Sequence, residues 1–427
     1  MKKFFIKSMG CKANQFEGSV IEEKLTNAGF ECVNKIENAD IYILNSCTVT
    51  HKSDNETLYL LRNAKHLNPL IKTLITGCVA QTEKEHLLKY DFIDYVLGND
   101  EKFDIVEFLS GDKNIIVGDI MNLSRFNEVI LADTSKTRAS LKIQDGCDNR
   151  CSYCIIPFAR GKSRSADSSF IIEQIKNFEK KEFKEVVFTG IHIGQWGKEH
   201  GKTILDLLKE VEKNTTIRYR LGSLNPLEIT DELLNFLSQS EQFCPHFHLS
   251  LQSACNRTLE RMNRFYKVED YLKQIDKINS MFNLPFIGSD IIAGFVGETE
   301  EDFEITLKNL EKSGLSAIHT FPYSIRKGTK AENMEGHLPD SVKEKRATLI
   351  KNISAQKTKE FLNKNINTIH KAIIEKHPDK KSSLLKSMTE NYITVILNTD
   401  DKNLINTAQN IKITEIINAK VYGEILR

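Results

Sequence analysis

The sequence has 427 residues, too many for one ordinary core, and suits two or three domains of roughly 100 to 200 residues each. Hydrophobic residues make up 40% and charged residues 27%, and no run of about 18 apolar residues could span a bilayer. The net charge of +1 excludes a protein coated in basic residues, so bulk charge does not predict nucleic-acid binding.

Cysteine usage indicates a reducing compartment. The chain starts with an apolar run behind two lysines, but Lys7 ends that run too early for a secretory signal. We expect a first β-strand there and a cytoplasmic protein. Nine cysteines are an odd number, and without a secretory signal a disulfide framework is not expected. Metal ligation or redox chemistry is the better use for these thiols.

The first part of the chain alternates short apolar runs with helical stretches, such as the helix-spaced apolar positions of residues 16–29. This alternation favours an α/β domain with a parallel sheet over residues 1–110. Its strands are expected at residues 4–8, 41–45 and 73–76.

A cysteine follows each of these three strands. Cys11, Cys47 and Cys78 are separated by 36 and 31 residues, close to one strand-helix-strand unit of about 30 residues. Parallel sheets gather their ligands outside the carboxyl ends of the strands. The three cysteines can therefore converge on one point.

The remaining chain divides into a connector and two further units. Residues 111–136 look like the connector, with a short strand pair and polar turns. Over residues 137–362 six strand-helix units predict a full or partial (β/α) barrel, with its active site at the strand carboxyl ends. Residues 363–427 show only β-type runs, which predicts a small all-β barrel. The expected strands of these two units are residues 139–143, 185–189, 218–222, 246–251, 285–292 and 317–323, then 392–397, 411–417 and 421–426.

Three cysteines directly after the first barrel strand indicate the chemistry. Cys147, Cys151 and Cys154 follow a C-x3-C-x2-C spacing. Such a set can hold an iron-sulfur cluster and leave its fourth iron without a protein ligand. That iron can chelate S-adenosylmethionine (SAM), so that an electron from the reduced cluster cleaves the sulfonium and yields a 5′-deoxyadenosyl radical. Zinc is the alternative, although structural zinc takes four ligands, usually in paired C-x2-C units.

This cysteine segment and residues 155–161 after it resemble the cluster-binding loop of radical SAM methylthiotransferases. The resemblance covers nearly the whole chain and implies SAM and two 4Fe-4S clusters as cofactors. It places Tyr153, Gly190 and Gln252 at the SAM site. The later segments that are similar to this family, in the same order, are residues 188–194, 248–253, 261–264, 290–295 and 321–324.

The family holds its second cluster on three cysteines of an amino-terminal domain, and the motifs around Cys11, Cys47 and Cys78 match that pattern. The alternative is that these thiols only pack in the interior, as free cysteine often does. The other cysteines match no motif, and we expect them to pack: Cys32, Cys244 and Cys255.

The resemblance also implies a reaction and a substrate. One SAM methylates sulfide on the second cluster, and another is cleaved so that its radical abstracts hydrogen from the substrate carbon. No catalytic side chain is assigned beyond the cluster ligands. The barrel and the first domain must face each other across a closed cavity, because an exposed carbon radical would be quenched.

The motifs at residues 10–12 and 45–50 look most like bacterial enzymes that modify N6-threonylcarbamoyladenosine at position 37 of tRNA, beside the anticodon. The alternatives are isopentenyladenosine at the same position and an aspartate of a ribosomal protein. An external electron donor and a sulfur source are further partners, and no membrane is expected among them.

The carboxy-terminal module resembles the TRAM domain, a small β-barrel that grips RNA in this family, although it has only one glycine, Gly423. A non-catalytic electron-transfer protein or iron-sulfur scaffold is a different class of answer, which would explain six cysteines but not an open iron inside a barrel. A basic stretch before the module is a second candidate for RNA contact, with a solvated helix face as the alternative: Arg326, Lys327, Lys330, Lys343, Lys345 and Arg346.

Overall fold

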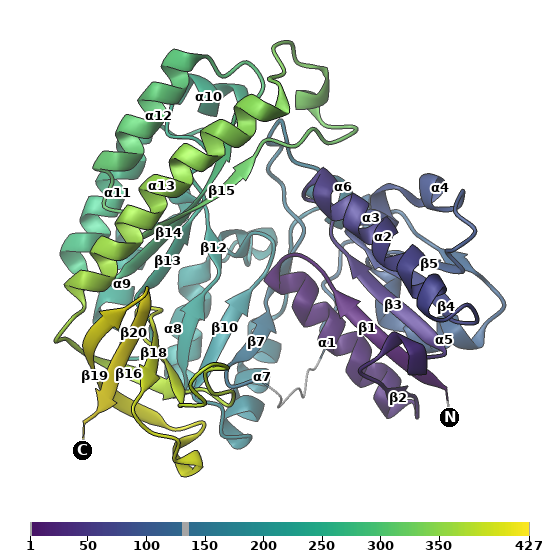
Figure 1. Ribbon diagram of the computed structural model, residues 1–427, viewed down its shortest axis with the longest axis horizontal. Helices are drawn as coiled ribbons and strands as arrows, with labels where there is room; N and C mark the ends of the chain where they lie inside the picture. The colour runs from purple at the N-terminus through teal and green to yellow at the C-terminus, as the bar shows by residue number, and fades with distance from the viewer. Residues whose placement is uncertain (1, 130–135, 427) are drawn as a thin grey trace.

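The computed structural model describes residues 2–129 and 136–426, so part of the expected connector and the two terminal residues lie outside the described residues. Three units follow one another along the chain (Figure 1): a parallel sheet with helices, an arc of parallel strands with outer helices, and a small closed barrel. The expected fold class is confirmed. Within the described segments, no helix is both long and apolar enough to cross a membrane.

The amino-terminal sheet is parallel throughout, in the order β2-β1-β3-β4-β5-β6. The β3 strand (Ile41–Ser46) is buried along its whole length, as expected for a parallel strand covered on both faces. The strand order reverses between β1 and β3, and such a switch point is where open parallel sheets bind ligands. The other bounds are β1 Lys3–Ser8, β2 Glu31–Cys32, β4 Lys72–Gly77, β5 Tyr95–Leu97 and β6 Ile115–Ile116.

Helices connect these strands. The sheet extends into residues 111–136, the expected connector, because β6 pairs with β5. Thr50 begins α2: its Oγ1 accepts a hydrogen bond from the Ser53 backbone N–H at 3.2 Å, which satisfies one free donor of the first turn. The helices are α1 Lys12–Asn27, α2 His51–Leu67, α3 Cys78–Thr82, α4 Lys84–Leu87 and α5 Ile105–Ser110.

The central unit is a partial barrel of parallel strands in sequence order. Only Gly222 separates β11 (Arg218–Leu221) from β12 (Ser223–Leu224), so these two form one interrupted strand. The described part of the partial barrel therefore has six strand positions, as expected. The other strands are β7 Ala139–Lys142, β10 Glu185–Thr189, β13 His246–Leu249, β14 Phe286–Ala293 and β15 Ala317–Pro322. The outer helices are α7 Ser168–Lys180, α8 Ile204–Asn214, α9 Asp231–Gln239, α11 Val268–Met281, α12 Glu300–Lys312 and α13 Asp340–Lys364.

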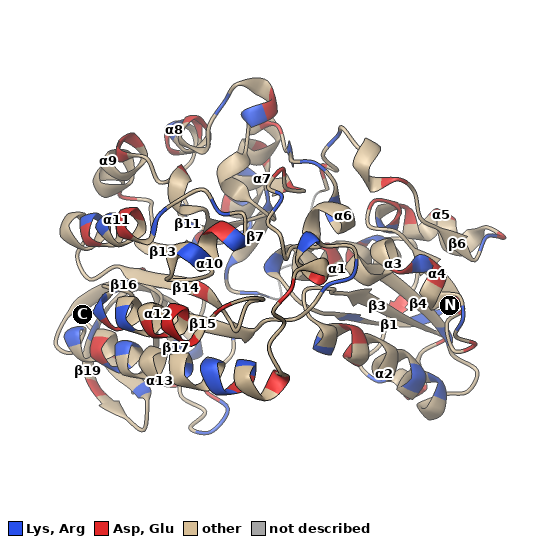
Figure 2. Cartoon of the chain, turned by 90° about the horizontal axis from the view of Figure 1, so that it is seen from above, with Lys and Arg blue, Asp and Glu red and all other residues tan. Residues whose placement is uncertain are grey.

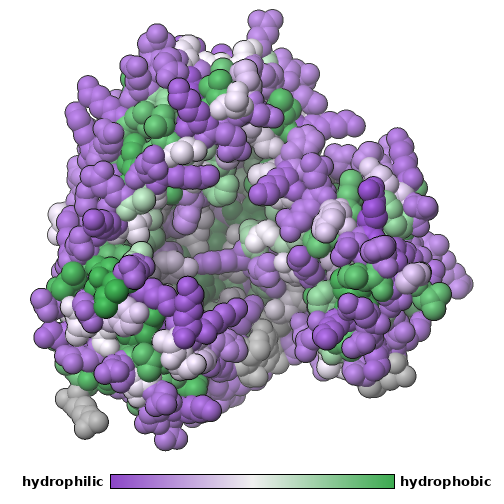
Figure 3. Space-filling model, in the orientation of Figure 1, coloured by the Kyte–Doolittle hydropathy of each residue, from purple (hydrophilic) through white to green (hydrophobic). Residues whose placement is uncertain are grey.

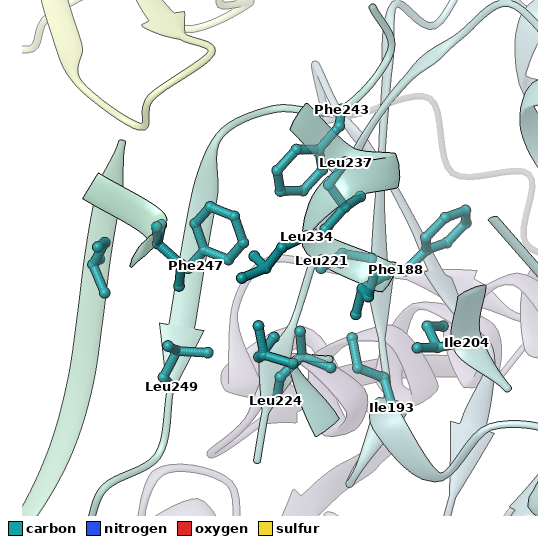
Figure 4. Packing of buried hydrophobic residues seen from close by; sticks show 14 of the residues in the cluster. Phe188, Ile193, Ile204, Leu221, Leu224, Leu234, Leu237, Phe243, Phe247 and Leu249 are labelled. Atoms are coloured by element: carbon teal, nitrogen blue, oxygen red, sulfur yellow. The ribbon is translucent and has the colours of Figure 1, made fainter. Parts of the chain in front are cut away.

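Apolar side chains of the strands and outer helices form one continuous core (Figure 4). Phe188 of β10, Leu221 of β11 and Phe247 of β13 are at most 1% exposed. Leu234 and Leu237 of α9 cover them from outside. This core fixes the strands, so the loops at their carboxyl ends start from rigid positions.

The carboxy-terminal unit is a closed five-stranded barrel, in the order β16-β17-β18-β20-β19. It packs against the amino-terminal ends of the partial-barrel strands, where the His246 and Tyr392 rings lie 4.3 Å apart. Arg220 donates to the backbone carbonyls of Glu390 and Thr389 at 2.9 and 3.2 Å. The strands are β16 Ile369–Ile374, β17 Lys386–Thr389, β18 Thr394–Leu397, β19 Ala408–Ile417 and β20 Lys420–Ile425.

Candidate cluster-binding site

Three loops at the carboxyl ends of β1, β3 and β4 bring the amino-terminal cysteines together. Gly10 has φ +81°, and a Cβ on it would lie 2.5 Å from the Cys47 Sγ, so only glycine allows this approach. The Asn14 side-chain amide donates to the carbonyls of Met9, Asn45 and Ser46 at 2.7, 3.2 and 3.0 Å. The convergence expected from strand spacing is therefore present between β1 and β3.

Cys78 joins the same group from the start of α3. Burial raises the pKa of the Cys47 thiol to about 12, and the neighbouring Cys78 and Cys11 thiols add to the effect. A thiol with such a pKa keeps its proton at neutral pH until a metal displaces it. The cysteines therefore lie within electrostatic range of one another, as ligands of a shared inorganic group must.

The second cysteine set lies on the loop that begins at Gly146, which has φ +71°. The Cys147 backbone N–H donates to the Gly161 carbonyl at 3.1 Å, and this hydrogen bond closes the loop. Ser152 anchors its middle: its Oγ donates to the Arg261 carbonyl at 2.7 Å and its backbone N–H to the Met262 carbonyl at 3.0 Å.

The thiols of this loop are also close to one another. Burial raises the pKa of Cys154 to about 12, with Cys151 and Cys147 adding to the effect. Among residues 2–129 and 136–426, no three His, Cys, Asp or Glu side chains are grouped so that they could hold one metal ion. A tetrahedral zinc needs all its thiolates within about 2.3 Å of one ion. Cysteines that each bind a different iron of a cluster stand further apart than the ligands of one zinc ion.

The residues expected at the SAM site all lie near the carboxyl ends of the barrel strands. Tyr153 is packed edge-to-face against Phe295, with ring centroids 6.1 Å apart. Gly190 directly follows β10, and a Cβ on it would lie 2.7 Å from the Gln144 carbonyl oxygen. Gln252 has φ +71° and is held further around the arc, where its N–H donates to the Asp290 carbonyl at 2.8 Å. Tyr153 lies within the cysteine loop, whereas Gln252 follows the end of β13 in the chain.

The structure adds His192, which sequence reasoning did not single out. Its Nδ1 lies 3.6 Å from the Cys147 Sγ, and its Nε2 forms an ion pair with Glu228. Burial alone would lower the pKa of His192, but the contacts with Cys147 and Glu228 raise it to about 9. Its position three residues after the end of β10 was the available sequence signal, since functional side chains gather at such strand ends.

The two cysteine sets belong to one interface between the first unit and the partial barrel. The Asn99 side-chain amide lies 3.8 Å from the Cys78 Sγ and donates to the Ala159 carbonyl at 2.7 Å, five residues beyond Cys154. Figure 3 shows a hollow at the centre of the molecule, between the amino-terminal unit and the other two. The two units thus face each other, as a protected radical reaction requires.

Comparison with known proteins decides the family. Residues 3–98 match the model described as uncharacterized protein family UPF0004, and residues 141–310 match the radical SAM superfamily. The threonylcarbamoyladenosine tRNA methylthiotransferase MtaB of Aquifex aeolicus is 36% identical over 403 residues, covering 92% of this chain and 96% of the relative. The chain belongs to the radical SAM methylthiotransferase family. Membership confirms the expected enzyme class and implies SAM and a 4Fe-4S cluster as cofactors.

Other relatives agree with this membership. The threonylcarbamoyladenosine tRNA methylthiotransferase MtaB of Bacillus subtilis is 33% identical. The match covers 91% of this chain and 89% of the relative. The tRNA-2-methylthio-N(6)-dimethylallyladenosine synthase of Dictyoglomus thermophilum is 32% identical, and the match covers 100% of this chain and 99% of the relative. The radical SAM methyltransferase TsrM of Kitasatospora setae, a solved structure, matches with a TM-score of 0.58 at 12% identity, covering 78% and 77%. This last likeness concerns the fold alone.

The basic stretch considered for RNA contact is only partly available. Arg326, Lys343 and Arg346 are at most 6% exposed, so the expectation of RNA contact is wrong for these three. Arg326 is paired with Asp54 and Arg346 with Glu298. Lys327, Lys330 and Lys345 are exposed. Positive and negative side chains alternate along α12 and α13 (Figure 2), which is typical of a solvated helix face.

The unassigned cysteines differ in their surroundings. Cys244 and Cys255 are buried, which confirms the expected packing. Cys32 is exposed at the edge strand β2, so the packing expectation is wrong there. A two-residue edge strand leaves its outer side open, which the sequence pattern did not reveal.

Proposed function

We propose that the methylthiotransferase adds a methylthio group to C2 of N6-threonylcarbamoyladenosine at position 37 of tRNA. The observation that carries this proposal is the similarity to enzymes named for that nucleoside, at 36% identity over 92% of the chain. A relative named for the dimethylallyl nucleoside is 32% identical over the whole chain, which makes isopentenyladenosine the second candidate.

Six cysteines would bind the two clusters. We propose Cys147, Cys151 and Cys154 as ligands of the cluster that binds SAM, with Tyr153, Gly190 and Gln252 lining the SAM site. A second 4Fe-4S cluster would take Cys11, Cys47 and Cys78. When bound, the two clusters and two SAM molecules would supply the methyl group, the sulfur-bearing site and the radical chemistry of the reaction. An external electron donor and a sulfur source complete the proposed partners.

The chain's own residues hold these two sites close to each other. Asn99 ties the Cys78 loop to the segment after Cys154 through its bond to Ala159. On the other side of the interface, the His51 backbone N–H donates to the Ser324 hydroxyl at 2.9 Å. Reactive intermediates survive only where solvent is excluded, so the reaction needs contacts that hold the two units together.

We propose three functional units: a cluster domain at residues 1–110, a SAM domain at residues 137–362 and an RNA-binding module at residues 363–427, with residues 111–136 as the connector. The exposed Lys327, Lys330 and Lys345 would add contacts to tRNA phosphates, which predicts binding that weakens with salt. The cytoplasm, where tRNA is found, is the proposed location.

The test uses the full chain, reconstituted anaerobically with iron and sulfide, and tRNA isolated from cells lacking the enzyme. We expect Cys154→Ala to abolish both 5′-deoxyadenosine and the methylthio nucleoside. Cys78→Ala should abolish only the methylthio nucleoside, and Cys32→Ser is the matched control that retains both products. Mass spectrometry of digested tRNA identifies the nucleoside. Modification of isopentenyladenosine, or of a ribosomal protein without tRNA, would refute the proposed substrate.

A further inference from the structure

A network of six buried charged side chains lies between the two cysteine sets. Glu17 of α1 is at its centre and is 0% exposed. Arg160 binds it through two parallel hydrogen bonds, Nη1 to Oε1 at 2.7 Å and Nη2 to Oε2 at 2.9 Å. Lys102 and Lys142 each reach one of the same oxygens at 2.5 Å. Glu17 therefore gathers three cations from three segments of the chain.

A second carboxylate completes the network. Asp145 accepts from Lys142 at 2.8 Å, from Arg160 at 3.1 Å and from Arg164 at 3.0 Å, and it is 7% exposed. Burial alone would raise the pKa of Glu17, but Arg160, Lys102 and Lys142 hold it well below the usual range, so Glu17 is ionised. The network thus holds four basic side chains and two carboxylates.

An excess of buried positive charge is costly unless an anion lies nearby. Of the four basic side chains, Arg160 interacts with the amino-terminal cysteines. Its positive charge acts on the Cys78 and Cys11 thiols. Its Nη2 also donates to the Asn14 side-chain oxygen at 3.2 Å, and Asn14 pins the Cys11 and Cys47 loops together.

One donor of Arg160 is still available. Its Nε is buried and has no hydrogen-bond partner within the described residues. A buried unsatisfied donor costs about 1–3 kcal/mol. An anionic cluster on the neighbouring thiolates would both accept this hydrogen bond and balance the excess charge, so the residues present fit such a group.

We infer that Arg160 is a positioning residue for the second cluster, supplying a positive charge and one N–H donor from the SAM domain and thereby raising the cluster's reduction potential. Arg160 ends α6 (Ile156–Arg160), six residues after Cys154, so one short segment contacts both sites. Positive charge and hydrogen bonds near the cluster sulfurs favour its reduced, more negative state. This inference rests on the proposed second cluster at Cys11, Cys47 and Cys78.

The experiment isolates that cluster in the full chain. Cys147, Cys151 and Cys154 are replaced by alanine, the protein is reconstituted with iron and sulfide, and the midpoint potential is measured by titration followed by electron paramagnetic resonance. Arg160→Met removes one positive charge and should lower the potential. Glu17→Gln removes one negative charge and should raise it. Each change should alter the ratio of reduced to oxidised cluster at least tenfold, which is about 59 mV for one electron.

The opposite signs distinguish an electrostatic role from a structural one. In the Glu17→Gln and Arg160→Met double variant the net charge is restored, so the potential should return toward the parent value. Glu185→Gln is the matched control, since it removes a buried carboxylate at the other end of the barrel strands and should leave the potential unchanged. Shifts of the same sign, or shifts within the spread of this control, would overturn the inference.

Two further outcomes are separable. If Arg160→Met does not retain a cluster, Glu17→Gln alone decides, and a potential that does not rise overturns the inference. If the triple alanine parent with Glu17 and Arg160 intact binds no iron-sulfur cluster, the proposed second cluster itself is refuted, and the inference falls with it.

Discussion

Replacing Gly10 by alanine should remove the proposed second cluster and spare the proposed SAM-binding cluster. Two physical costs add at this position. A left-handed backbone costs a residue with a Cβ about 1–2 kcal/mol. The new Cβ would also lie 2.5 Å from the Cys47 Sγ and 2.6 Å from its Cβ, so a proposed cluster ligand must move.

Overpacking of this kind adds about 1–3 kcal/mol. The total is about 2–5 kcal/mol, equivalent to a roughly 30- to 4,000-fold weaker hold on the cluster at about 1.4 kcal/mol per tenfold. The protein should lose one of the two proposed 4Fe-4S clusters, or about 4 iron atoms per chain. It should still form 5′-deoxyadenosine from SAM but yield no methylthio nucleoside.

Gly29 provides a matched control within the same domain. It has φ +88°, and a Cβ on it would meet nothing within 4 Å. Gly29→Ala therefore carries the backbone cost without the steric contact and should retain its iron and both products. Iron analysis and product assays on the two variants give the comparison. If Gly10→Ala binds as much iron as Gly29→Ala, the close approach of Gly10 to Cys47 does not govern cluster binding.

Three further changes test other parts of the molecule. Gly146→Ala places a Cβ 1.9 Å from the Lys162 carbonyl oxygen at φ +71°, so SAM cleavage to 5′-deoxyadenosine should stop while the iron of the second cluster remains. Cys32→Ser changes an exposed thiol and should leave iron content and turnover unaltered. Glu185→Gln leaves Arg218 and Arg220 without their carboxylate and should destabilise the chain by about 3–5 kcal/mol, measured by chemical denaturation at pH 7. Burial would raise the pKa of Glu185, but these arginines lower it from 4.5 to about 2, so the difference between wild type and Glu185→Gln should shrink as the pH falls from 4.5 toward 2. A difference independent of pH would contradict the last prediction.

The local pattern of this sequence determines its secondary structure and the places of its cysteines at the strand ends. Apolar runs such as β3 are short and continuous because both of their faces are covered, and that pattern is visible without a structure. The spacing of Cys147, Cys151 and Cys154 is also local, since one loop carries all three. For Cys11, Cys47 and Cys78 the regular strand-helix spacing was sufficient, because parallel strands end at one edge of a sheet.

Only the tertiary structure decided which charged residues are internal. Glu17 and Arg160 are 143 residues apart, and nothing in the segments around them marks either as buried. Likewise Arg326 reads as part of a basic surface stretch, yet it is buried in an ion pair with Asp54. A charge can leave water only where partners from distant segments surround it. These ion pairs form only where distant segments pack together. A local sequence pattern does not show which distant segments will pack together.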